Sequence, residues 1–94
     1  MLGIPFNIAS YSLLTCLIAH ICGYIPHKMI HVIGDAHIYM NHIESAREQL
    51  TRIPMTEPRI VFNRHLDNIE DFRYEDVELL DYFPHDPIRF KLAV

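Results

Sequence analysis

Tryptophan is absent from this sequence, and glycine and cysteine are scarce, with three and two residues among 94. Gly3, Gly23 and Gly34 lie far apart, which excludes a glycine-rich phosphate loop. Cys16 and Cys22 stand six positions apart within an apolar run, so they form neither a CxxC motif nor a disulfide framework. Neither has a sequence context that would activate a thiol, and we interpret both as reduced, buried side chains.

No lysine or arginine precedes Lys28, so the apolar N-terminal region has no basic segment of the kind that opens a signal peptide. Polar residues and a proline interrupt this region, whereas a membrane-spanning helix needs about 20 uninterrupted apolar residues. We therefore expect no membrane partner and a buried helix from Asn7 to Cys22, with a membrane-spanning helix as the less favoured alternative. Asn7 is the expected N-cap, and Gly23 the expected left-handed residue after the last turn.

Charge is also scarce, because only 21% of the residues are charged while 50% are hydrophobic. A net charge of −4 argues against nucleic acid as a partner. The composition is too apolar for disorder, and too apolar for a chain this short to cover with its own polar surface. We expect one small domain over residues 1–94, with missing chain or an oligomeric partner covering the excess apolar surface.

The remaining pattern predicts a mixed α/β (α+β) fold. Helical periodicity covers residues 41–52, where Glu48 and Arg52 can pair one turn apart. The expected strands are residues 28–33, 59–66 and 77–80, and residues 88–94 are expected to form a final strand or an extended tail. The acidic stretch from Asp67 to Asp81 is expected to be a solvated edge.

The most unusual stretch is 31–42, which holds three histidines, an aspartate, a tyrosine and an asparagine in otherwise apolar sequence. Strand alternation after the break at Gly34-Asp35 places His37, Tyr39 and Asn41 on one face. Such a row of hydrogen-bonding groups predicts a binding site. The histidine spacing fits no compact zinc pattern, so we expect no metal.

Five segments carry a resemblance to a known family. They are GIPFNIASY at 3–11, GDAHIYMNH at 34–42, DFRYED at 71–76, YFPH at 82–85 and AV at 93–94. Together they closely resemble the C-terminal third of thymidylate synthase, in order and spacing, over essentially the whole chain. The resemblance implies the C-terminal part of the synthase fold, in which a long buried helix packs on a mixed, largely antiparallel sheet.

The resemblance also implies an activity, the reductive methylation of dUMP to dTMP. In that family 5,10-methylenetetrahydrofolate is the co-substrate and serves as both carbon donor and reductant. The implied partners are dUMP, a reduced folate and a second copy of the full-length chain in a homodimer. The implied location is the cytoplasm, with the nucleus and the mitochondrion as alternatives.

Matching positions imply the site residues. Asn7 matches the asparagine that reads the pyrimidine edge, since its amide can donate to O4 and accept from N3–H. His37 and Tyr39 match the pair that binds the deoxyribose 3′-hydroxyl. The residues that match the family's folate contacts are Leu2, Gly3, Phe6, Ala93 and Val94. Related deoxycytidylate hydroxymethylases carry aspartate at the position of Asn7, so the asparagine favours uracil over cytosine.

The family's catalytic cysteine, in a Pro-Cys-His context, has no counterpart in these 94 residues. Cys16 and Cys22 follow Asn7 within the predicted helix and cannot replace it. The Arg-Ser-x-Asp run, which clamps phosphate and anchors the pterin, is also absent. We therefore expect this chain to be inactive alone. The alternative is a catalytically dead remnant or an interaction module that docks on a full-length synthase, and an unrelated small binding domain is the least favoured possibility.

Overall fold

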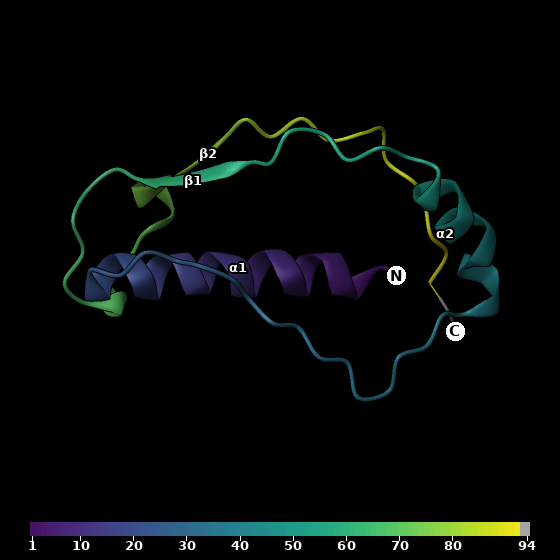
Figure 1. Ribbon diagram of the computed structural model, residues 1–94, viewed down its shortest axis with the longest axis horizontal. Helices are drawn as coiled ribbons and strands as arrows, with labels where there is room; N and C mark the ends of the chain where they lie inside the picture. The colour runs from purple at the N-terminus through teal and green to yellow at the C-terminus, as the bar shows by residue number, and fades with distance from the viewer. Residues whose placement is uncertain (93–94) are drawn as a thin grey trace.

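A computed structural model describes residues 1–92 as a small, mixed α+β chain (Figure 1). The two helices are α1, Gly3–Cys22, and α2, Ile43–Leu50, and the two strands are β1, Arg59–Phe62, and β2, Val77–Leu80. Single 3-10 turns lie at Met40–His42, Ile69–Asp71 and Tyr74–Asp76. The expected mixture of helix and sheet is confirmed, with less sheet than the sequence pattern predicted.

Helix α1 begins four residues earlier than predicted, so the assignment of Asn7 as its N-cap is wrong. The residue at the N-cap is Leu2, which makes no side-chain capping bond. Pro5 lies in the first turn, where a helix does not need the missing N–H, so the helix can extend upstream past it. The C-terminal prediction is confirmed: Gly23 has φ 71°, and the Tyr24 N–H donates to the carbonyl of Ala19 over 2.8 Å.

The predicted burial of α1 is wrong for this chain. Only Leu17 and Ala19 are buried, both near its C-terminal end, where the helix contacts β1 and the turn at Ile69–Asp71. There the His20 ring stacks on Phe62 at 4.5 Å. The N-terminal half of the helix is largely exposed, and only partial cover, including Met29 beside Ser12, reaches its middle. With a mean hydropathy of 1.5, α1 would also satisfy the length and composition of a membrane span, a criterion that core helices of soluble proteins meet as well.

Strands β1 and β2 form a two-stranded antiparallel sheet in which Arg59 faces Leu80 and Phe62 faces Val77. The strand predicted at 77–80 is confirmed, whereas the one predicted over 59–66 ends at Phe62. Within the described residues, 28–39 form no strand, contrary to prediction, and of the two alternatives for 88–94 the described part, 88–92, forms no strand either. A strand needs a neighbour to satisfy its N–H and C=O groups, and neither segment has one here.

An ion pair closes the loop between the two strands. Arg64 donates from Nε to one Asp76 carboxylate oxygen over 2.7 Å and from Nη2 to the other over 2.9 Å. The Arg73 N–H donates to the same carboxylate over 2.8 Å, and the Asn63 N–H donates to the Asp76 carbonyl over 2.8 Å. Asp76 is buried, so the acidic stretch is not a solvated edge at this position. The Arg64 guanidinium and the Arg73 N–H lower the pKa of Asp76.

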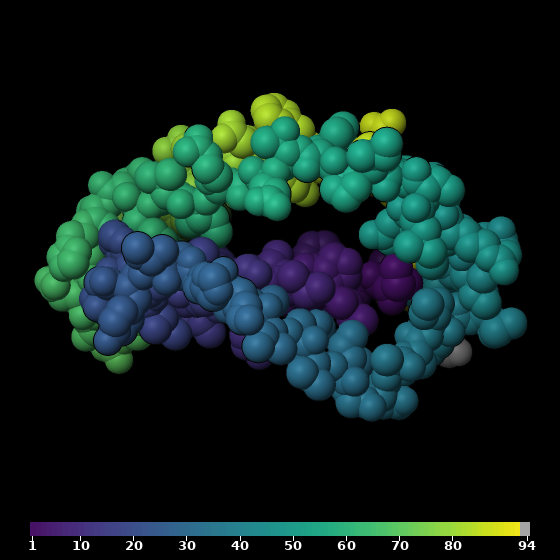
Figure 2. All heavy atoms as spheres, in the orientation of Figure 1, coloured from purple at the N-terminus to yellow at the C-terminus, as the bar shows by residue number. Residues whose placement is uncertain are grey.

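The chain as a whole is an open ring, with α1 on one side and the sheet and its flanking segments on the other (Figure 2). Its accessible surface is 8218 Å², against about 5,700 Å² for a compact protein of this mass. Its radius of gyration is 16.3 Å, against about 12 Å for a compact domain. About 2,500 Å² of surface therefore lacks the cover that a compact fold gives.

This uncovered surface predicts the behaviour of the purified 94-residue chain. We expect it to bind the dye 8-anilinonaphthalene-1-sulfonate strongly and to lose its far-UV circular dichroism gradually with urea, because few side chains pack in a shared core. Dye fluorescence and a urea titration at several protein concentrations measure both. A sharp, two-state transition of a monomer would contradict the expectation.

The Arg64–Asp76 pair predicts an acid-sensitive sheet. Because folding lowers the pKa of Asp76, its stabilising contribution is fully present above the ordinary aspartate value of about 4 and is lost as the pH falls through the folded value. Carbon NMR of the Asp76 carboxyl should show titration below that ordinary value. The variant Asp76→Asn should lose strand signal at neutral pH, and a carboxyl that titrates at the ordinary value would mean that the pair does not form in solution.

Candidate functional site

The histidine-rich stretch folds as an irregular loop that brings two predicted site residues together. A bend at Gly34-Asp35 lets His37 Nδ1 donate to the carbonyl of Asp35 over 2.9 Å. The rings of His37 and Tyr39 meet edge to face with centroids 5.4 Å apart. The predicted strand is wrong, but the proximity of these two side chains is confirmed.

The hydrogen bond to Asp35 determines what His37 can offer to a ligand. A carbonyl oxygen only accepts, so Nδ1 carries the proton and Nε2 presents a lone pair. Tyr39 is about half exposed, at 50%, and its hydroxyl can both donate and accept. His37 and Tyr39 are both exposed, so an acceptor and a hydroxyl on neighbouring rings suit a ligand hydroxyl group that both donates and accepts.

His42 is the residue of this stretch that sequence reasoning missed. It is 2% exposed, and its backbone N–H donates to the carbonyl of Tyr39 over 2.9 Å, which closes the 3-10 turn before α2. Its Nε2 donates to the Lys91 carbonyl over 2.5 Å, and its ring meets those of Tyr39 and Phe90 edge to face, at 5.6 and 5.1 Å. The only available signal was its position three residues after Tyr39, at the start of helical periodicity.

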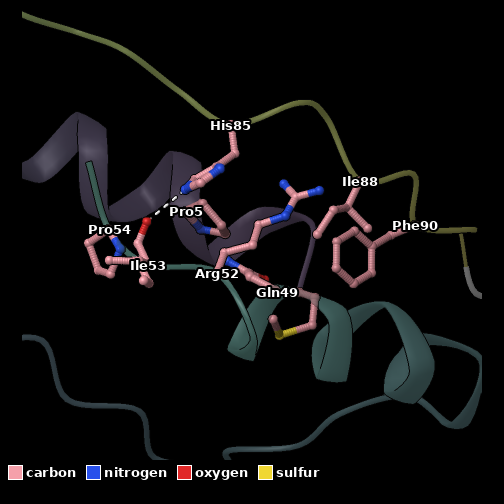
Figure 3. Close-up of a pocket in the computed structure, with 9 residues that line it drawn as sticks. Pro5, Gln49, Arg52, Ile53, Pro54, His85, Ile88 and Phe90 are labelled. Carbon is pink, nitrogen blue, oxygen red and sulfur yellow. Dashed lines mark hydrogen bonds between the residues drawn. The ribbon is translucent and has the colours of Figure 1, made fainter. Parts of the chain in front are cut away.

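Two further hydrogen bonds hold residues 85–92, here called the C-terminal segment, near the end of α2. Arg52 Nη1 donates to the carbonyl of Asp86 over 2.5 Å, and His85 Nε2 donates to the carbonyl of Ile53 over 2.7 Å (Figure 3). Arg52 also pairs with Glu48 over 3.2 Å, as its spacing predicted.

A pocket of about 360 Å³ opens between this segment and the start of α1 (Figure 3). Its lining residues are Met1, Pro5, Gln49, Arg52, Ile53, Pro54, His85, Ile88 and Phe90. The pocket therefore brings Met1 and Pro5 together with Ile88 and Phe90.

Of the predicted folate contacts, Leu2, Gly3 and Phe6 are close in sequence to Met1 and Pro5 but do not line the pocket. Leu2 is half-buried, and Gly3 and Phe6 are exposed in the first turns of α1, with Phe6 75% exposed. Ala93 and Val94 lie outside the described residues.

Asn7 stands apart from the loop. It is exposed on α1, and its amide donates to the carbonyl of Gly3 over a long 3.4 Å. Among the hydrogen bonds and ring contacts of residues 1–92, none joins Asn7 to His37 or Tyr39. The structure thus assembles the histidine–tyrosine pair and leaves the third predicted nucleotide contact separate.

The cysteines match their interpretation only in part. Both are free thiols, but Cys16 is half-buried and Cys22 is exposed, so the predicted burial is wrong for Cys22. Over residues 1–92, no group of three histidine, cysteine or carboxylate side chains is arranged to hold a metal ion.

Comparison with known proteins gives this arrangement its family. The family model described as thymidylate synthase matches residues 1–94. The chain is 52% identical to the thymidylate synthase of Mycoplasma mobile and to that of Saimiriine herpesvirus 2, in each case over 99% of this chain and 32% of the relative. It is 47% identical to the bifunctional dihydrofolate reductase-thymidylate synthase of Crithidia fasciculata, over 99% of this chain and 18% of the relative.

The chain thus spans about a third of the length of the synthases that it matches. The match nevertheless covers the chain from end to end, including the loop that holds His37 and Tyr39 and the helix that holds Asn7. This chain belongs to the thymidylate synthase family.

Proposed function

We propose that this chain supplies the pyrimidine, ribose and folate contacts of a thymidylate synthase that converts dUMP to dTMP. The observation that carries the proposal is the end-to-end family match together with the contact between His37 and Tyr39. The finer assignments below follow from the chemistry of the side chains.

The ribose contact is the best supported by geometry. With its Nδ1 proton engaged by Asp35, His37 offers Nε2 as an acceptor for a ribose hydroxyl proton. The Tyr39 hydroxyl can donate to the same ribose oxygen. Two neighbouring partners with opposite roles would fix the sugar orientation, and hence the direction in which the base projects.

The base contact is assigned to Asn7. Its amide would donate to O4 of uracil and accept from N3–H, and the same donor would stabilise negative charge that develops on O4 when a nucleophile adds to C6. In this structure the Asn7 amide donates to the Gly3 carbonyl over 3.4 Å. A hydrogen bond of this length is weak, so replacing the carbonyl by a nucleotide acceptor would cost little free energy. Cytosine would present a donor where uracil presents O4.

The folate contacts are assigned to the two ends of the chain. Leu2 and Phe6 would offer apolar surface to the rings of 5,10-methylenetetrahydrofolate, and Gly3 would let the ligand approach the backbone. Ala93 and Val94 are assigned to the same ligand from the C-terminal side. When bound, the folate supplies the one-carbon unit and the reducing equivalents, while these residues bind it and exclude water.

The nucleophile and the phosphate clamp are not among these 94 residues, so we propose that the chain alone does not catalyse methylation. In a full-length synthase we propose a homodimer and a cytoplasmic, nuclear or mitochondrial location. The second candidate is an inactive module that docks on a full-length synthase, which the large uncovered surface of this chain favours as well.

A chimeric enzyme tests the proposal. The 94-residue chain replaces its matching 93-residue segment in the Mycoplasma mobile thymidylate synthase. We expect the chimera to convert dUMP within about tenfold of the parent rate, because the contacts named above would all be present. The measurement is dTMP formation with 5,10-methylenetetrahydrofolate. The 94-residue chain alone should show no turnover, and a chimera that folds but does not bind dUMP would favour the inactive module.

The variant Asn7→Asp in the chimera tests the base contact. A carboxylate repels O4 and cannot stabilise charge on it, so kcat/KM for dUMP should fall by about 100-fold or more. Binding of dCMP should improve, because cytosine donates where uracil accepts. Asn68→Asp is the matched control, since the Asn68 side-chain oxygen only accepts from the Glu70 N–H and a carboxylate keeps that bond. An unchanged preference for dUMP in Asn7→Asp would show that Asn7 does not read the base.

A further inference from the structure

Among the described residues, His42 and Leu66 have the two most completely buried side chains, in a chain whose surface is otherwise largely uncovered. The His42 ring contacts the Tyr39 ring on one side and the Phe90 ring and the Lys91 carbonyl on the other. We propose that His42 is a positioning residue. It holds the loop that contains His37 and Tyr39, here called the ribose-binding loop, and the C-terminal segment in one arrangement. This inference rests on the proposed function of Tyr39 and of the chain's C-terminal residues.

The contact on the loop side fixes the ribose-binding tyrosine. The backbone N–H of His42 donates to the Tyr39 carbonyl, and the His42 ring lies perpendicular to the Tyr39 ring, at 89°. An edge-to-face pair of this kind restrains the ring it meets. Tyr39 in turn meets His37, so the position of His42 bears on both members of the ribose pair.

The contacts on the C-terminal side fix the chain just before its last residues. The hydrogen bond from His42 Nε2 to the Lys91 carbonyl joins positions 49 residues apart in the sequence. The bonds of Arg52 and His85 fix the segment near Asp86, several residues upstream. Downstream of these two bonds, within the described residues, the His42 side chain binds the backbone of Lys91.

The chemistry of the ring explains why a histidine suits this position. The Lys91 carbonyl requires a donor, so Nε2 carries the proton and Nδ1 has a bare lone pair, which is buried without a partner in the described part of the chain. Burying this unpartnered acceptor is unfavourable, so the advantage of histidine lies in its other contacts. A flat ring with a donor at its far edge can meet two aromatic rings and a carbonyl together, and no other side chain of this size does both.

Two variants in the chimera separate these roles. His42→Phe keeps a flat ring against Tyr39 but has no donor for Lys91. His42→Gln keeps a donor, because its amide nitrogen can reach the place of Nε2, but it loses the ring. Each variant therefore removes one of the two proposed contacts, the ring against Tyr39 or the hydrogen bond to Lys91, and keeps the other.

The readouts are the hydrogen exchange of residues 85–92 and the Kd of dUMP measured by equilibrium dialysis, neither of which needs turnover. His42→Phe should speed exchange of the C-terminal segment by about 3- to 10-fold and leave the Kd of dUMP near that of the unmodified chimera. His42→Gln should weaken dUMP binding by about 2- to 10-fold and leave exchange nearly unchanged. His65→Phe and His65→Gln are matched controls, because His65 is exposed and pairs with Asp67, away from both segments.

Equal changes of both readouts in the two variants, accompanied by a lower melting temperature, would overturn the inference and leave His42 a packing residue. Unchanged readouts in both variants would also overturn it. An unmodified chimera that does not bind dUMP would overturn the proposed function and the loop half of the inference. The exchange data would then decide the C-terminal half independently.

Discussion

Helix α1 needs an opposing wall, and this requirement governs the rest of the structure. Leu17 and Ala19 find cover where the helix meets β1, and His20 stacks on Phe62 there. Toward its N-terminal end Phe6 remains 75% exposed. An apolar helix left open to water loses most of the stabilisation that its side chains could provide. The chain folds as a ring because its side chains cannot fill the space that α1 faces (Figure 2).

The lack of an opposing wall also explains which sequence predictions succeeded. Helix α2, strand β2, the left-handed Gly23 and the Glu48–Arg52 pair depend on neighbours within a few residues or on one adjoining hairpin. The strand predicted at 28–33 depends on a pairing partner, as does the choice between strand and extended tail at 88–94, so periodicity alone could not decide them. Asn7 was misassigned for a local reason, since Pro5 permits a helix start upstream of it.

The candidate site shows the same difference between local contacts and contacts between distant residues. His37 and Tyr39 are two residues apart, so alternation was enough to predict that they meet, even though the backbone between them is not a strand. The link from His42 to Lys91 spans 49 positions and involves a backbone carbonyl, which has no signature in a sequence. The ion pair of Arg64 with Asp76 was hidden in the same way inside an acidic stretch that looked solvated. Local chemistry could be predicted, and hydrogen bonds and ion pairs between residues far apart in the sequence could not.

These long-range bonds explain how so open a chain can keep parts of a site in order. A ring with a sparse core has few packing contacts to define distances between segments, so directional hydrogen bonds take over that role. His42 and Arg52, just before and just after α2, tie the C-terminal segment to this helix region, and His20 ties α1 to the loop after β1 through the Arg64 carbonyl. Asn7 has no such link to the ribose pair, so its distance from them depends on the wall that α1 lacks. Completing that wall is therefore what would bring the proposed base contact, Asn7, together with the proposed ribose contacts.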